Sequence, residues 1–245
     1  MGLKLIIPMK KVSLLLLVGC LFWSACEKNE DKPSNNHTCT TCVNNPEANP
    51  ALNNSSGGVY KGIIVGSSGT IALYLHNDSS NEVKALVVFD GGSATLTTTD
   101  LNNWTPGQAI TNALFTGTVN NTNIQAVFSV DANGQNPSLA VNIPGHTVVV
   151  ALYKETSTTL VKSFEGTYAG DNSGTFNLLF HGDHFNIIVE GGQEIFNSSL
   201  TNGEMNFSQN DVEIKGQFNG ADQMNGTWKD TENGTQGTWT ANRTL

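Results

Sequence analysis

A ten-residue pattern that occurs twice constrains this chain more than any other feature. Its first copy covers residues 69–78 and its second covers residues 174–183, and both read Gly-Thr-apolar-x-Leu-x-apolar-His-x-Asp without a gap. Every second position is apolar in both copies, which is typical of a half-buried β-strand. Ile71 and Phe176 would therefore face the same side of their sheets as the apolar residues that follow them. The pattern predicts a β-protein built from two related halves.

The rest of the chain after Gly57 also favours an all-β fold. Short alternating runs are separated by turn signals such as Asp90-Gly91-Gly92 and Asn233-Gly234. No long segment has the 3.6-residue period of a helix, and only residues 155–163 suggest a helical turn. Because parallel strands would need crossover helices, we expect antiparallel sheets.

The two halves are expected at residues 57–154 and 164–245, and each begins with Gly-x-Tyr-x-Gly, at Gly58 and at Gly166. Either half alone is small for a β-sandwich, so we expect the two to pack closely into a barrel or a sandwich. A closed barrel would also remove exposed strand edges. Two small barrels or sandwiches in tandem are the alternative.

Residues 1–25 have the features of a secretory signal peptide. A basic leader precedes an apolar run from Val12 to Ala25, which is shorter than the roughly 20 residues of a membrane-spanning helix. The end of this run, Ser24-Ala25-Cys26, resembles the processing site of bacterial lipoproteins. In that family the cysteine is acylated, so the resemblance implies that Cys26 anchors the mature protein to a membrane without spanning it.

Two alternatives to Cys26 remain open from the sequence. Leu17-Val18-Gly19-Cys20 fits the lipoprotein pattern well but leaves a very short apolar region before it. An ordinary secreted protein cut after Ala25 is the other alternative. The polar run Glu27-Lys28-Asn29-Glu30-Asp31 resembles the acidic export signal of Bacteroidota surface lipoproteins, which implies an outer-membrane location at the cell surface.

Residues 26–56 are expected to form a disordered tether, because they are rich in Asn, Pro, Ser and Thr and carry almost no large apolar groups. The tether contains Cys39 and Cys42. A Cys-x-x-Cys pair can close a disulfide, bind a metal ion or carry out redox chemistry. We expect a disulfide, because an exported protein meets an oxidising compartment. Redox chemistry usually needs a βαβ setting, and a structural zinc site needs four ligands.

Charge and composition exclude one class of partner. Removal of residues 1–25 takes away three lysines and leaves 9 basic against 21 acidic residues, a net charge of −12. Such a chain repels phosphate backbones, so we expect no nucleic-acid binding. Charged residues make up only 13% of the chain. Asn, Thr, Gly and Ser supply the remaining polarity, as strands and turns of extracellular β-proteins require.

Three tryptophans are candidate ligand-binding residues. If Asn233-Gly234 were a two-residue turn, Trp228 and Trp239 would pair directly across two strands and present both rings on one face. Such a surface could stack on sugar rings, although paired aromatic rings are more often core. Trp104 lies in a loop with Pro106 and Gly107, where it could bind a ligand or pin its own loop to the protein.

The sequence His181-Gly182-Asp183-His184 is a candidate metal site. If Gly182-Asp183 formed a two-residue hairpin turn, the two histidines would face each other with Cβ atoms about 5 Å apart. Asp183 could add an oxygen ligand. A solvated turn explains the same residues without a metal, and we expect no cofactor.

No catalytic motif indicates an enzyme. The chain has no Gly-x-Ser-x-Gly, no His-Glu-x-x-His and no phosphate-cradling glycine loop. We therefore expect a non-enzymatic, lipid-anchored protein that binds a small or carbohydrate ligand or another envelope protein. Alternatives are a structural accessory subunit of an outer-membrane assembly and a glycan-active enzyme with a pair of carboxylates.

Overall fold

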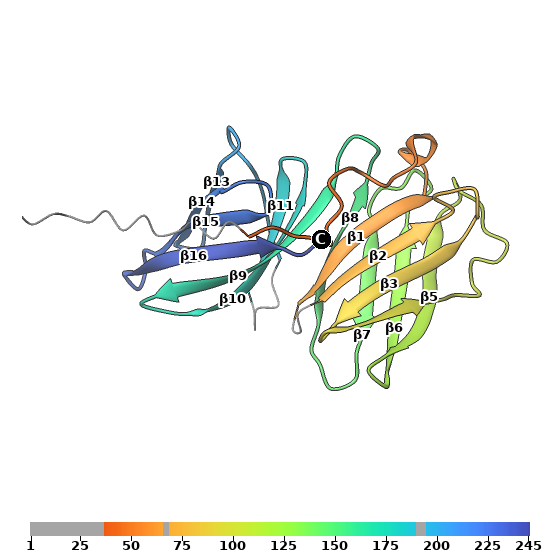
Figure 1. Ribbon diagram of the computed structural model, residues 1–245, viewed down its shortest axis with the longest axis horizontal. Helices are drawn as coiled ribbons and strands as arrows, with labels where there is room; N and C mark the ends of the chain where they lie inside the picture. The colour runs from red at the N-terminus through yellow and green to blue at the C-terminus, as the bar shows by residue number, and fades with distance from the viewer. Residues whose placement is uncertain (1–36, 66–68, 190–194) are drawn as a thin grey trace, which may run out of the picture. The chain divides into compact units, whose positions relative to one another are not determined.

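The computed structural model describes residues 37–65, 69–189 and 195–245. These residues form sixteen antiparallel strands and one short 3-10 helix, η1 (Pro50–Leu52). The first half, shown in Figure 1, contains β1 (Gly58–Val65), β2 (Gly69–Leu75), β3 (Val83–Phe89), β4 (Gly92–Leu96), β5 (Ile110–Val119), β6 (Thr122–Val130), β7 (Ser138–Asn142) and β8 (Val149–Glu155). The all-β, antiparallel prediction is confirmed.

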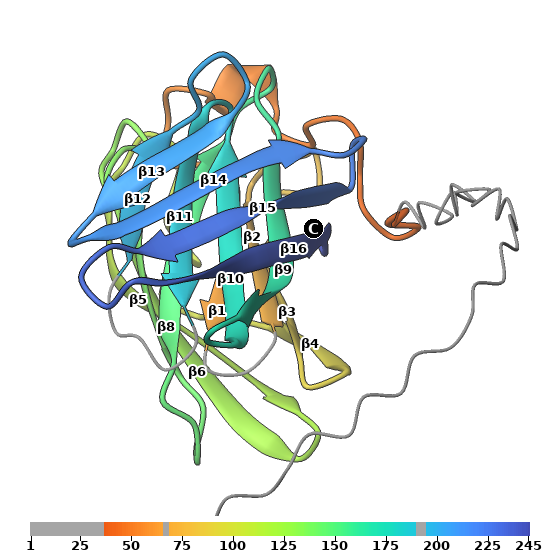
Figure 2. The ribbon, with the colours of Figure 1, turned by 90° about the vertical axis from the view of Figure 1, so that its left-hand side faces the viewer.

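The second half, labelled from another side in Figure 2, also contains eight strands. They are β9 (Val161–Gly170), β10 (Gly174–His181), β11 (His184–Val189), β12 (Phe196–Ser199), β13 (Met205–Gln209), β14 (Val212–Phe218), β15 (Gln223–Asp230) and β16 (Thr235–Arg243). Successive strands pair within each half, except β4 with β5 and β7 with β8 in the first half and β12 with β13 in the second, so each half is an up-and-down meander with breaks.

Each half closes on itself, because its first strand pairs with its last. In the first half β1 pairs with β8, and a five-stranded sheet (β4-β3-β2-β1-β8) faces a three-stranded sheet (β5-β6-β7) as a sandwich. In the second half β9 pairs with β16 in one eight-stranded sheet. The ends of this sheet, β12 and β13, lie next to each other without a continuous ladder, so it is a nearly closed barrel.

Three separate hydrophobic clusters show how the halves are related. One cluster fills the first half around Tyr60 and Phe128, and another fills the second half around Phe164 and Trp239. A small third cluster, which includes Ile63 and Leu179, lies where the halves meet. The two halves therefore do not share one barrel interior, and the tandem arrangement describes the chain better than a joint barrel.

The repeated pattern occupies the second strand of each half. Ile71 on β2 pairs with Gly62, and Phe176 on β10 pairs with Gly166. Both side chains are buried in the core of their own half. This register makes Tyr60 the equivalent of Phe164, so the Gly-x-Tyr-x-Gly match between Gly58 and Gly166 is displaced by four residues and does not hold.

Two local predictions were wrong. No helical turn forms at residues 155–163, because β8 runs to Glu155 and β9 already begins at Val161. Buried side chains at Val161 and Phe164 stabilise this strand. The strand β7 was not predicted, although its burial alternates: Leu139 and Val141 pack on the core and the residues between and beside them are exposed.

A buried ion pair joins the first half to the start of the second. Lys61 Nζ lies 3.0 Å from Glu155 Oε2, and the two side chains are 1% and 0% exposed. The Glu155 carboxylate also accepts hydrogen bonds from the backbone N–H groups of Glu47 and Val161. Lys61 contacts a second carboxylate, Glu47, at 2.7 Å. One buried carboxylate thus holds the strand that leaves the first half and the strand that enters the second.

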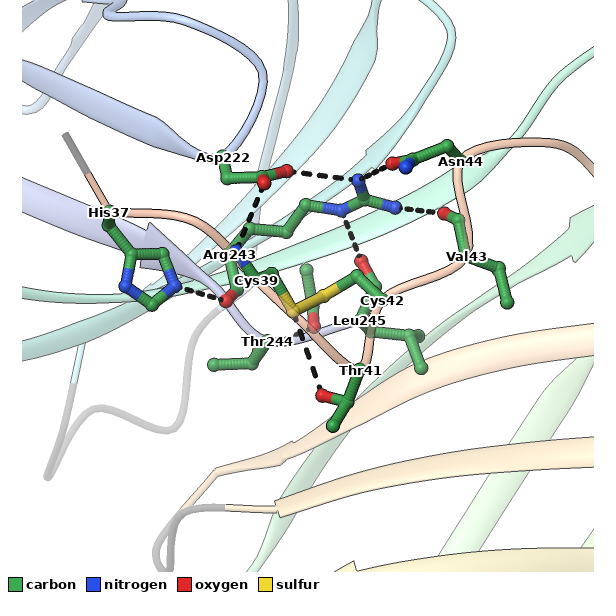
Figure 3. The surroundings of a disulfide bond; sticks show 11 residues. His37, Cys39, Thr41, Cys42, Val43, Asn44, Asp222, Arg243, Thr244 and Leu245 are labelled. Atoms are coloured by element: carbon green, nitrogen blue, oxygen red, sulfur yellow. Dashed lines mark hydrogen bonds and ion pairs between the residues drawn. A yellow bond between two sulfur atoms is a disulfide. The ribbon is translucent and has the colours of Figure 1, made fainter.

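The segment from His37 to Ser56 is ordered, in contrast to the disordered tether expected for residues 26–56. A disulfide joins Cys39 to Cys42, as expected. The Cys39 N–H donates a hydrogen bond of 3.0 Å to Asp222, and the buried guanidinium of Arg243 donates to the Val43 carbonyl and to Asn44 (Figure 3). These contacts fix residues 37–44 against the second half, whereas the residues that follow are held by the first half, for example through Glu47 N to Glu155 and Asn49 N to Asn77.

The expected signal peptide, Cys20, Cys26 and the first part of the tether lie outside the described residues. Within the described ranges, no helix has the length and apolar character needed to cross a membrane.

Candidate functional site

An open cavity of about 410 Å³ lies inside the second half. Its walls come from the inward faces of seven strands, and most of the lining side chains are apolar. The lining residues are Tyr168, Asn172, Ser173, Phe176, Leu178, Ile187, Val189, Met205, Val212, Ile214, Trp228, Asp230 and Trp239. A cavity of this size and composition fits the interior of a small-molecule site.

Glycines make room for the aromatic walls of this cavity. Trp239 on β16 lies opposite Gly226 on β15, which in turn lies opposite Gly216 on β14. A methyl group at Gly216 would come within 2.1 Å of Trp239 Cζ2, and one at Gly226 within 2.6 Å of Trp239 Cε2. The indole ring therefore lies across two residues that have no side chain. Trp228 lies opposite Gly237 in the same way.

The pairing of the two tryptophans differs from the prediction. Trp228 pairs with Gly237 and Trp239 pairs with Gly226, so the tryptophans are diagonal neighbours and not direct partners. The turn has four residues, 231–234, because the Asp230 carboxylate accepts hydrogen bonds from Glu232 N, Asn233 N and Asn233 Nδ2. The shift is two residues, which leaves both rings on the same face of the sheet.

The polar atoms of the tryptophan walls already have partners. Trp239 Nε1 donates to the carbonyls of Lys215 and Thr227 at 3.1 and 3.2 Å, and Trp228 Nε1 donates to Ala169 O at 3.3 Å. Tyr168 meets Trp228 edge to face, with ring centroids 5.8 Å apart. The rings therefore present apolar surface to the cavity, and they leave few donors for a sugar.

The polar residues of the site lie at its mouth. Asn172 and Ser173 are exposed in the β9–β10 turn, and Asp230 ends β15. Hydrogen bonds from the Asn233 side chain, and from the Asn233 and Glu232 backbones, lower the pKa of Asp230. This carboxylate is consequently ionised at neutral pH.

Comparison with known proteins does not place this site in a family. No protein-family model, no curated protein and no solved structure matches the chain.

Trp104 does not line this cavity. It is 8% exposed in the first half, and its Nε1 donates to Gln108 O at 2.9 Å within the same loop. Its ring lies 5.3 Å from that of His76. Trp104 thus pins its own loop to the protein, which is the second of the two readings that its position allowed.

His181 and His184 pair directly across a two-residue turn, as predicted. His184 Nδ1 lies 2.8 Å from Ser199 Oγ, and His181 stacks on Tyr153 with ring centroids 5.6 Å apart. Burial, and to a smaller extent His184, lowers the pKa of His181. The histidines and Asp183 do not form a ligand set, and in the described parts of the chain no three His, Cys, Asp or Glu residues are grouped as a metal would require.

Lys154, a lysine of the first half with a shifted pKa, has a structural role. Burial lowers its pKa to about 8. Its Nζ donates to the carbonyls of Ser55 and Gly57 and lies 3.3 Å from the Tyr60 hydroxyl. Carbonyl acceptors on the preceding loop surround the ammonium group, so it fastens this loop over the end of the sandwich.

Sequence reasoning found the two tryptophans but missed the rest of the cavity. The signal that could have found it is the reciprocal order of Gly226-Thr227-Trp228 and Gly237-Thr238-Trp239. Each tryptophan faces the glycine of the other motif, so the two rings need the space that the glycines leave.

Proposed function

We propose that this protein is a non-enzymatic binding protein that takes a small, predominantly apolar molecule into the cavity of the second half. The observation that carries the proposal is the aromatic wall of Tyr168, Phe176, Trp228 and Trp239 around about 410 Å³ of open space. The first half has no comparable role in this proposal, because large buried side chains such as Phe115 and Phe128 fill its interior. A carbohydrate fits less well, because its hydroxyls would lose water without gaining partners on apolar walls.

Filling the cavity should abolish binding of a neutral apolar probe. We expect N-phenyl-1-naphthylamine to bind the full chain and to brighten on binding. Val212→Trp places a large ring at a partly exposed lining position and should weaken binding at least about tenfold, because it removes much of the apolar contact area. Fluorescence titration measures this change.

Lys215→Trp is the matched control for this experiment. Lys215 lies three residues along the same strand and on the opposite, exposed face. This variant should bind the probe as the unchanged protein does. Equal binding by the two variants, or no binding by the unchanged protein, would remove the basis for the proposed site.

We infer that the binding half is held at an outer membrane by acylation of Cys26. The signal-like residues 1–25 and the acidic run after Cys26 support this anchor. The protein expressed with labelled palmitate should incorporate label, and Cys26→Ser should lose it whereas Cys20→Ser should retain it. Label retained by Cys26→Ser and lost by Cys20→Ser would move the anchor to the other cysteine. Absence of label in the unchanged protein would contradict a lipid anchor.

We also infer that the two halves descend from one duplicated unit. The common order of eight antiparallel strands supports this origin, as do Ile71 and Phe176 on the second strand of each half. A superposition of the halves that separated these two residues would contradict it.

A further inference from the structure

The mouth of the cavity in the second half carries several acidic residues. In an up-and-down meander every second turn lies at the same end, so the β9–β10, β13–β14 and β15–β16 turns share the end where Asn172 and Ser173 line the cavity. These turns contain Asp171, Asp211 and Glu232, and Asp230 precedes the last of them. The mouth is therefore a region of negative potential.

Asp230 is the carboxylate that belongs to the cavity lining itself. Its hydrogen-bond partners are the neutral N–H groups of Glu232 and Asn233, and none of the ion pairs in the described part of the chain involves it. Lys229, the neighbouring basic residue, occupies the opposite face of β15, as successive residues of a strand do. The negative charge at the cavity is thus not neutralised from within the strand.

The aromatic wall next to Asp230 also favours a positively charged ligand. Trp228 is partly exposed and lies two residues before Asp230 on the same face of β15. The face of an indole ring attracts a cation through its quadrupole, and tryptophan is the strongest of the aromatic side chains in this respect. A positive group at the mouth would meet the Trp228 ring and the Asp230 carboxylate together, while the apolar body of the ligand filled the interior.

We propose that the natural ligand is an apolar molecule with a positively charged group, such as an aromatic or alkyl amine, and not an anionic lipid or a fatty acid. This inference rests on the proposed binding function of the cavity. An anion would place its charge beside Asp230 and the acidic turns, where like charges repel. A neutral ligand would fill the interior without using the charge at the mouth.

Three probes with one naphthalene body test the inference. They are 1-naphthylmethylamine as the cation, 1-naphthalenemethanol as the neutral molecule and 1-naphthoate as the anion. The protein is the full chain with Cys20→Ser and Cys26→Ser, which carries no acyl group that could compete for the cavity. By calorimetry at low ionic strength, we expect the amine to bind about tenfold more tightly than the carboxylate, with the alcohol between them.

Charge-removing variants separate the contribution of the mouth from that of the interior. Asp230→Asn keeps an oxygen for the turn and should reduce the ratio of the affinity for the amine to the affinity for the carboxylate. Asp183→Asn is the matched control, because it removes an exposed carboxylate from the β10–β11 turn at the other end of the second half. This variant should keep the full preference, and added salt should reduce the preference in all three proteins.

The outcomes distinguish the two proposals. If the alcohol binds but the amine and the carboxylate bind equally well, the charged-ligand inference is wrong and the binding function stands. If the carboxylate binds most tightly, the inference is likewise wrong. If none of the three probes binds, both the inference and the proposed function are overturned.

Discussion

Replacement of Lys61 by methionine should lower the free energy of unfolding by about 3–5 kcal/mol, as the loss of one partner from a buried ion pair generally does. Lys61 and Glu155 are both almost fully buried, and the carboxylate would remain in the interior without a counter-ion. Glu47, the other carboxylate that contacts Lys61, carries the same charge as Glu155 and so could not replace the lost counter-ion. The cost should be large because the same carboxylate holds Val161, the first residue of the second half.

Urea denaturation at neutral pH measures this effect, and two further variants make the result specific. In Lys61→Met/Glu155→Gln the uncompensated charge is gone, so part of the loss should be recovered. The recovery should be incomplete, because Glu47 N and Val161 N bind different oxygens of the carboxylate and the single amide oxygen can accept from one of them. Lys84→Met breaks an ion pair whose partner Glu82 is exposed, and should cost less than about 1 kcal/mol. A Lys61→Met protein as stable as Lys84→Met would contradict the structural role of the buried pair.

Substitution of alanine for Gly216 should destabilise the second half by about 1–3 kcal/mol, the usual cost of overpacking a core. The added methyl group would overlap the Trp239 ring, which would have to leave its position across β14 and β15. Because Trp239 also forms a wall of the cavity, the same substitution should weaken binding of a neutral probe. Thermal unfolding and the fluorescence titration measure the two effects separately.

A double-mutant cycle identifies the ring as the cause of this loss. In a protein that already carries Trp239→Leu, the change Gly216→Ala should cost much less, because the indole ring no longer fills the space. Thr227→Ala on the exposed face of β15 should change stability by no more than about 0.5 kcal/mol. Equal costs of Gly216→Ala with and without the indole would show that the backbone, and not Trp239, resists the substitution.

Regular alternation made most strands predictable, and side-chain interactions explain the departures from that pattern. The strand at residues 69–75 was predictable because Ile71, Leu73 and Leu75 alternate and all three are buried. The position of the last turn was not, since Asn233-Gly234 favours a two-residue turn in isolation. The Asp230 carboxylate binds two backbone N–H groups and so stabilises a longer one.

The order of residues 37–56 could not be read from local composition. The segment has few apolar groups, and its position is fixed by partners that lie far away in the chain. These are Asp222 and Arg243 for residues 37–44, and Asn77 and Glu155 for residues 47–49. Charged residues are expected at the surface, so nothing in the sequence distinguishes the buried Arg243 from the solvated lysines. The cavity was only half predictable for a similar reason, because its mouth is made of turns whose grouping depends on how the meander closes.

The attachment of residues 37–44 to Arg243 determines how the chain would carry mechanical load. Arg243 lies on the last strand, which is paired with β9 and β15. A force applied to the chain ahead of His37 would therefore act first on the last strand of the protein, and would reach β1 only after the hydrogen bonds to Asp222 and Arg243 had broken. The disulfide limits how far residues 39–42 could extend under such a force. Pulled from its N-terminal side, the molecule would thus be loaded at its C-terminal strand, and the sandwich would be shielded until that attachment failed.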